Sequence, residues 1–264
     1  MGDQEQPLTQ TTLKLMELYM RVLPLWNRYF PYTQPPPPPL YHYTNAAGLV
    51  GILDSGSLWA SAIGHSNDLR EIACAFELAR PILTELAAQP EFQKQNQHLL
   101  MSVLEKFFED PESPMQDGFA VSFCAKPDLL NQWRAYGDEG GFSLEIYPLA
   151  RASVHEPDTE AMDVVLLRSA IGRKLLVRKV NYDSIEQQAE FRERVITTSR
   201  LLDEVTEEIP DADTTAVVVT LLTSSLIEWV YTVKDVAFAE EQEWRLICLP
   251  DINYFIWRQD VQTL

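Results

Sequence analysis

Apolar positions along the chain change repeatedly between helical and strand spacing. Spacing of three to four residues predicts long helices at 10–30, 69–88, 91–109, 184–207 and 214–230. Alternating or short apolar runs predict strands at 40–44, 57–61, 119–124, 142–147, 174–182, 244–249 and 254–257. Shorter helices or turns are expected at 46–53 and 129–136. Short strands separated by long helices indicate an α+β domain with helical inserts.

The first part of the chain looks separate from this domain. The helix at 10–30 has an apolar face and is expected to bend or end near Pro24. Five consecutive prolines at 35–39 form a stiff extended segment, which serves either as a spacer or as a ligand for a proline-binding module. Because the run directly precedes a strand, we favour the spacer, with a helical extension at 1–34 and the main domain at 40–264. The apolar face of the helix needs cover, from the domain or from a second subunit in a homodimer.

Composition narrows the class of protein. With 46% hydrophobic residues the chain has enough apolar side chains for a globular core. The 21 Lys and Arg against 39 Asp and Glu give a net charge of −18, which argues against broad nucleic-acid binding, because that needs a basic surface.

Cellular context follows from three further features. The cysteines, Cys74, Cys124 and Cys248, are too few and too scattered for a disulfide framework or a cysteine-rich zinc site. No secretory signal is visible, and the most apolar run, 216–227, is shorter than the roughly 20 residues of a membrane span. We therefore expect a soluble, cytoplasmic protein with no membrane contact.

Two polar groups lie early in the domain. On a strand, His42 and Thr44 share one face and Tyr43 takes the other, so the histidine can meet a ligand hydroxyl or be satisfied by backbone. Asn67 or Asp68 precedes a helix, and either residue can cap that helix or contact a ligand.

A third group lies in the middle of the chain. Trp133, Arg134 and Tyr136 precede a glycine-rich turn. These residues could form one wall of a ligand pocket, with Arg134 pairing to a phosphate, or could be ordinary packed aromatics beside a surface arginine.

The fourth group comes late. On a strand, Glu241, Glu243 and Arg245 point to one face, where two adjacent carboxylates repel each other unless they have partners. A solvated strand edge, partly neutralised by Arg245, is the structural alternative.

The order of these groups resembles the ADP-ribosyltransferase superfamily. A His-aromatic-Thr strand comes first, a Ser-bearing strand lies in the middle, and a Glu-x-Glu strand comes late. More closely, Leu-Tyr-His-Tyr-Thr, Asn-Asp-x2-Glu, Asn-Gln-Trp-x2-Tyr-Gly and Glu-x-Glu-Trp-Arg-Leu-Ile resemble the bacterial domain-of-unknown-function family 2971. The similar segments cover much of 40–147 and 235–249. The resemblance implies a split β-sheet core that binds NAD as a substrate, without a metal.

The resemblance also implies roles for the late and early groups. His42 would hold a ribose hydroxyl, and Thr44 would stand near the nicotinamide amide. Glu243 would accept a hydrogen bond from the ribose and stabilise the positive charge that develops as nicotinamide leaves. Glu241 would orient or deprotonate the acceptor. His42 and Glu243 are therefore predicted to line one cleft.

The remaining candidates would surround the rest of the NAD molecule. Tyr136 or Tyr43 would stack on the nicotinamide ring. Arg134 or Arg70 would hold the pyrophosphate. Asn67 would contact the nucleotide from its loop, and either Ser122 or Tyr136 fills the middle signature position.

These residues are compatible with three functions. The first is transfer of ADP-ribose from NAD to protein, nucleic acid or water, in a toxin or phage-defence effector. The second is a non-catalytic module of the same fold that binds a nucleotide or a protein. The third, a metal-dependent hydrolase using Asp68, Glu71, Glu241 and Glu243, ranks lowest because no histidines are paired at ligand spacing.

Overall fold

The computed structural model describes residues 10–30, 39–62, 69–109, 118–137, 140–146, 173–211 and 213–250. The α-helices are α1 (Gln10–Tyr29), α2 (Ala46–Ser55), α3 (Leu69–Ala87), α4 (Gln95–Glu109), α5 (Leu130–Tyr136), α6 (Ser184–Glu208) and α7 (Thr214–Val230). Two 3₁₀ helices are η2 (Pro90–Gln93) and η3 (Val236–Glu241). The strands are β1 (Leu40–Asn45), β2 (Ser61–Ala62), β3 (Phe119–Cys124), β4 (Gly141–Ile146), β5 (Arg173–Lys179) and β6 (Glu243–Pro250). The α+β class is confirmed.

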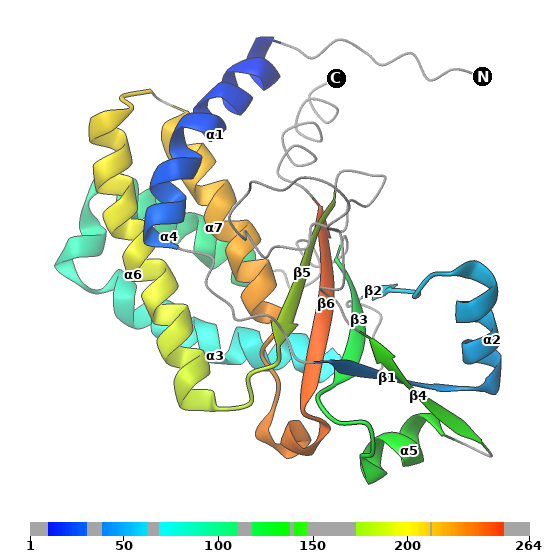
Figure 1. Ribbon diagram of the computed structural model, residues 1–264. Coiled ribbons are helices and arrows are strands. Elements are labelled where there is room, and N and C mark those ends of the chain that lie inside the picture. Colours follow the sequence, from blue (N-terminus) through cyan, green and yellow to red (C-terminus); the bar gives the residue numbers. More distant parts are fainter. Residues whose placement is uncertain are drawn as a thin grey trace.

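The strands of this part of the chain form one antiparallel sheet in the order β4-β1-β3-β6-β5, with β2 paired to β3. Each strand is paired along its length to its neighbour within β4-β1 and within β3-β6-β5. Between β1 and β3 the register holds one pair, Tyr41 opposite Cys124. In Figure 1 the β1-β4 ribbon accordingly runs across the direction of β3, β6 and β5. The sheet thus consists of a two-strand and a three-strand part that meet at one point.

The main core lies on the helical side of the three-strand part. Helices α1, α3, α4, α6 and α7 gather beside β5 and β6, while α2 and α5 flank β1 and β4 (Figure 1). The largest side chains with less than 2% exposure include Trp229, Tyr231, Phe92, Phe108 and Phe191. Burial of each such side chain contributes about 1.5–3 kcal/mol, so this helical layer is the main apolar support of the sheet.

Helix α1 is part of this core. It does not end at Pro24 but continues to Tyr29, because its apolar face packs on α6 and α7 and outweighs the lost hydrogen bond of the proline. Leu18, Val22 and Leu25 on that face are at most 5% exposed. The apolar face of α1, which was predicted to need burial, is therefore buried against helices of the same chain.

One strand prediction is wrong. At 57–61 the chain is irregular up to Ala60, and only Ser61 and Ala62 pair with β3. Trp59, whose alternation with neighbouring residues suggested a strand, is 86% exposed and gains nothing from sheet packing. The strand expected at 254–257 and Pro35–Pro38 lie outside the described residues.

Candidate functional site

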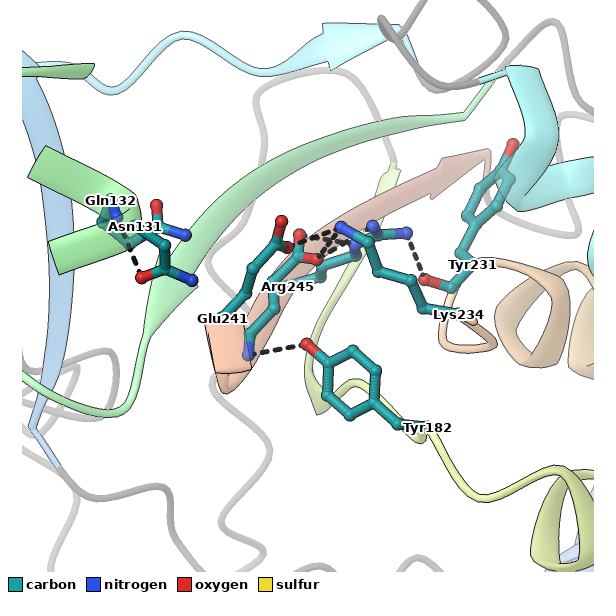
Figure 2. A network of polar contacts seen from close by, with 8 residues as sticks. Asn131, Gln132, Tyr182, Tyr231, Lys234, Glu241 and Arg245 are labelled. Atoms are coloured by element: carbon teal, nitrogen blue, oxygen red, sulfur yellow. Dashed lines mark hydrogen bonds and ion pairs between the residues drawn. The ribbon is translucent and has the colours of Figure 1, made fainter. Parts of the chain in front are cut away.

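A buried network of charged side chains lies where η3 leads into β6 (Figure 2). Lys234 Nζ lies 2.7 Å from Glu241 Oε2 and 3.0 Å from Glu243 Oε2. Arg245 also binds Glu243, with Nε 2.8 Å from Oε1 and Nη2 3.1 Å from Oε2. The side chains of Lys234, Glu243 and Arg245 are only 6–8% exposed, whereas that of Glu241 is 26% exposed. Among the described residues, two carboxylates and two cations thus form a charge-balanced cluster that reaches solvent mainly at Glu241.

The backbone between the two glutamates explains how both reach one lysine. Glu241 ends η3 and Glu243 begins β6, so simple strand alternation does not relate them. Gln242 between them has φ 48°, in the left-handed region that non-glycine residues seldom adopt. This turn brings the Glu241 carboxylate to Lys234. The predicted proximity of the two carboxylates is correct, but it arises from a turn rather than from one strand.

Electrostatics fix the charge of Glu243. Burial alone raises the pKa of this carboxyl, but Arg245, Lys234 and a hydrogen bond from Ser122 together lower it to about 2. Glu243 is therefore ionised at neutral pH. Burial, together with the two glutamates, raises the pKa of the Cys124 thiol to about 12, so Cys124 is a neutral side chain rather than a nucleophile.

Backbone contacts hold the network in place. The Glu243 amide donates to the Tyr182 hydroxyl at 3.0 Å, and Arg245 Nη1 donates to the Tyr231 carbonyl at 2.8 Å (Figure 2). Burial raises the pKa of Tyr182 above its ordinary value, so its hydroxyl stays protonated. The cluster is thereby tied to the end of β5 and the end of α7.

Ser122 and Tyr136 lie beside this network. Ser122 is exposed on the central strand β3, where it pairs with Arg245, and its side chain hydrogen-bonds Glu243. Tyr136 ends α5, which contacts η3. Burial of its hydroxyl, followed by the charges of Glu241 and Glu243, raises the pKa of Tyr136, although the residue as a whole is 53% exposed. Both candidates for the middle signature position therefore border the carboxylates.

His42 approaches from the other face of the sheet. Tyr41 is opposite Cys124, and Cys124 is opposite Glu243, so Tyr41 and Glu243 share a face and His42 points away from it. The prediction that His42 and Glu243 line one cleft does not hold in this register. His42 Nδ1 instead lies 3.1 Å from the Ser122 carbonyl oxygen. Since a carbonyl only accepts, Nδ1 carries the proton.

The neighbours of His42 have structural contacts. Tyr43 is 6% exposed; its hydroxyl donates to the Lys126 carbonyl and accepts from the Leu129 amide, both at 2.9 Å. Thr44 packs on the first turn of α2, since a Cβ on Gly48 would lie 2.0 Å from its hydroxyl oxygen.

No hydrogen bond or ion pair between described residues brings the other candidates to the network. Arg134 is exposed on α5. Asn67 and Asp68, and the side chains of Arg70 and Glu71, lie outside the described residues. No group of three or more His, Cys, Asp or Glu side chains in the described ranges could hold a metal ion.

Sequence reasoning missed Lys234 and Tyr182. Lys234 stands in the short connection after α7, where a single polar residue predicts only a solvated loop. Tyr182 was expected at the end of the strand 174–182, but β5 ends at Lys179 and Tyr182 follows it. The one available signal was the unbalanced Glu241–Glu243 pair, which required a second cation besides Arg245.

Comparison with known proteins supports the family suggested by the sequence. Residues 132–246 match the model of a family described as "Protein of unknown function (DUF2971)". The match begins in α5 and ends in β6, so it includes Lys234, Glu241, Glu243 and Arg245. No curated protein and no solved structure matches the chain. In the part that the structure describes, no helix is both long and apolar enough to cross a membrane.

Proposed function

We propose that the protein transfers ADP-ribose from NAD to a macromolecular acceptor, at the point where β1 parts from β3. The observation that carries this proposal is the single pairing between the two parts of the sheet, next to the carboxylate network. A split sheet with carboxylates beside the parting strands fits part of the arrangement that the resemblance to ADP-ribosyltransferases implies, whereas His42 lies on the other face.

The solvent exposure of each side chain indicates its role in this reaction. Glu241 is the carboxylate with solvent access, so it meets the ribose or the acceptor, while Glu243 holds the charged network behind it. Tyr136 is exposed beside them and offers a ring for the nicotinamide. His42 supports the Ser122 carbonyl from the far face and so positions β3.

The reaction needs a preplaced negative charge more than a redox group or a metal. The bond between ribose and nicotinamide breaks, and nicotinamide leaves with the electron pair. The acceptor nucleophile then bonds to the ribose carbon and passes its proton to a base. Positive charge develops on the ribose in the transition state, and a fixed carboxylate stabilises it.

The test is nicotinamide release and acceptor labelling by the full chain with labelled NAD and a cell lysate. Glu241→Gln should lower turnover by about 10²–10³ while NAD affinity changes little. Glu240→Gln is the matched control, since Glu240 is an exposed residue of the same turn. Absence of release by the wild type with every acceptor, or equal rates for Glu241→Gln and the wild type, would refute the proposal.

A second candidate is a non-catalytic module that binds a nucleotide or a protein. The neutrality and burial of the network favour it, because a carboxylate held between two cations is suited to a structural role. Saturable NAD binding in calorimetry without nicotinamide release would favour this module over the enzyme.

A further inference from the structure

We infer that Lys234 is the positioning residue for Glu241, and that Glu243 does not depend on it in the same way. The inference deepens the proposed function and rests on it for its kinetic test, whereas its stability test stands independently. It starts from an asymmetry in how the two carboxylates are held.

The two carboxylates differ in their partners. Glu243 is bound by Arg245 through two contacts and by Lys234 through one. Within the described part of the chain, Lys234 is the cation that binds Glu241. Removing the ammonium therefore leaves Glu243 with a partner and Glu241 without one.

Lys234 also sits where it can hold the whole η3 turn. It lies two positions before the first residue of η3, and its Nζ lies 4.9 Å from the centre of the Phe238 ring, halfway along the turn. Its contact with Glu241 closes the turn at its far end. The turn next contacts α5, the helix that carries Tyr136, so the contact of Lys234 with Glu241 helps to fix Glu241 relative to Tyr136.

Charge counting gives the expected pattern of effects. Lys234→Met removes one positive charge from a largely buried cluster, and Arg245 is then the cation that the described residues keep beside the two carboxylates. A further change of Glu241 to Gln restores the neutral Glu243–Arg245 pair. The second substitution should therefore relieve part of the damage caused by the first, which is the signature of direct coupling.

The stability test is a cycle of the wild type, Lys234→Met, Glu241→Gln and the double variant, followed by thermal unfolding at pH 7. Lys234→Met should lower the midpoint by at least about 6 °C. The double variant should unfold at a higher temperature than Lys234→Met. Lys126→Met, on an exposed lysine before α5, is the control and should leave the midpoint unchanged.

Additive losses in the cycle would overturn the inference. If Lys234→Met alone does not fold, recovery of a folded double variant supports the coupling, and failure of both overturns it.

The kinetic test separates positioning from general support of the fold. Lys234→Met, assayed well below its unfolding temperature, should lose about 10² in turnover, and the double variant should be no slower than Glu241→Gln. A Lys234→Met enzyme as fast as the wild type would overturn the positioning role. If the wild type itself releases no nicotinamide, the proposed function fails, while the unfolding cycle still decides whether Lys234 holds Glu241.

Discussion

Replacing Glu243 with glutamine gives the sharpest test of the charged network. The substitution keeps the size of the side chain and removes one negative charge between Arg245 and Lys234. Among the described residues, Glu241 is then the carboxylate that still pairs with Lys234. The lost negative charge lies beside Lys234 and Arg245, whose side chains are only 8% and 6% exposed.

The size of the effect follows from the pKa of Glu243. Its fall from 4.5 to about 2 corresponds, at 1.36 kcal/mol per pKa unit, to about 3 kcal/mol of stability at neutral pH. Removing one member of a buried ion pair typically costs about 3–5 kcal/mol, which agrees with this figure. We therefore expect the free energy of unfolding at pH 7 to fall by about 3 kcal/mol in Glu243→Gln.

The pH dependence has a definite sign. A carboxyl whose pKa is lowered by folding stabilises the protein above its unfolded pKa, and this contribution disappears as the pH falls through the folded value. The contribution of Glu243 is thus complete above about 4.5 and declines towards pH 2. The difference between wild type and Glu243→Gln should shrink across that window.

Urea unfolding followed by circular dichroism at pH 7, 5, 4 and 3 measures this difference. Glu240→Gln is the control, because Glu240 is exposed and its loss should change stability by no more than about 0.5 kcal/mol. A Glu243→Gln protein as stable as the wild type at pH 7, or a loss that stays constant down to pH 3, would refute the ionised, paired state of Glu243.

Three further changes test the surrounding structure. Gly118→Ala should lower stability by about 1–3 kcal/mol in thermal unfolding, because its Cβ would lie 2.1–2.6 Å from atoms of the buried Tyr231 side chain; Gly140→Ala, whose Cβ meets nothing within 4 Å, is the control. Tyr182→Phe should cost about 1–3 kcal/mol in urea unfolding, since the Glu243 amide loses its acceptor. Removal of residues 1–30 should produce aggregates on gel filtration, because it uncovers the apolar faces of α6 and α7; a folded, non-aggregated product would show that α1 is dispensable.

Local sequence patterns were sufficient for most of the strands and helices. The strands at 119–124 and 142–147 alternate clearly, and β3 and β4 lie at these positions within one residue. The exceptions arise where tertiary packing overrides the local signal. Pro24 is tolerated because Val22 and Leu25 on either side of it are buried. The alternating 57–60 segment finds no neighbouring strand and stays irregular.

The charged network could be predicted only in part. The proximity of Arg245 to Glu243 could be predicted, because residues two positions apart on one strand share a face. Lys234 lies nine positions from Glu243 across a 3₁₀ turn, a separation with no fixed geometry in the sequence. The left-handed Gln242 that brings Glu241 back to this lysine has no signature either, since glycine is the residue expected there.

The position of His42 shows most clearly what a sequence pattern cannot predict. Alternation correctly placed His42 and Thr44 on one face of β1 and Tyr43 on the other, but it cannot say which of these faces Glu243 shares. That depends on the register between β1 and β3, where a shift of one residue exchanges the two faces.

The register rests on the Tyr41–Cys124 pair and on the buried Leu40, which packs with Val121 and Phe123 on the face of His42. Burial of Leu40 contributes more to the stability of this register than the half-buried His42 does. Turning Leu40 to the other face would remove it from its apolar cluster. The position of His42 is thus set by the packing of Leu40, two residues before it.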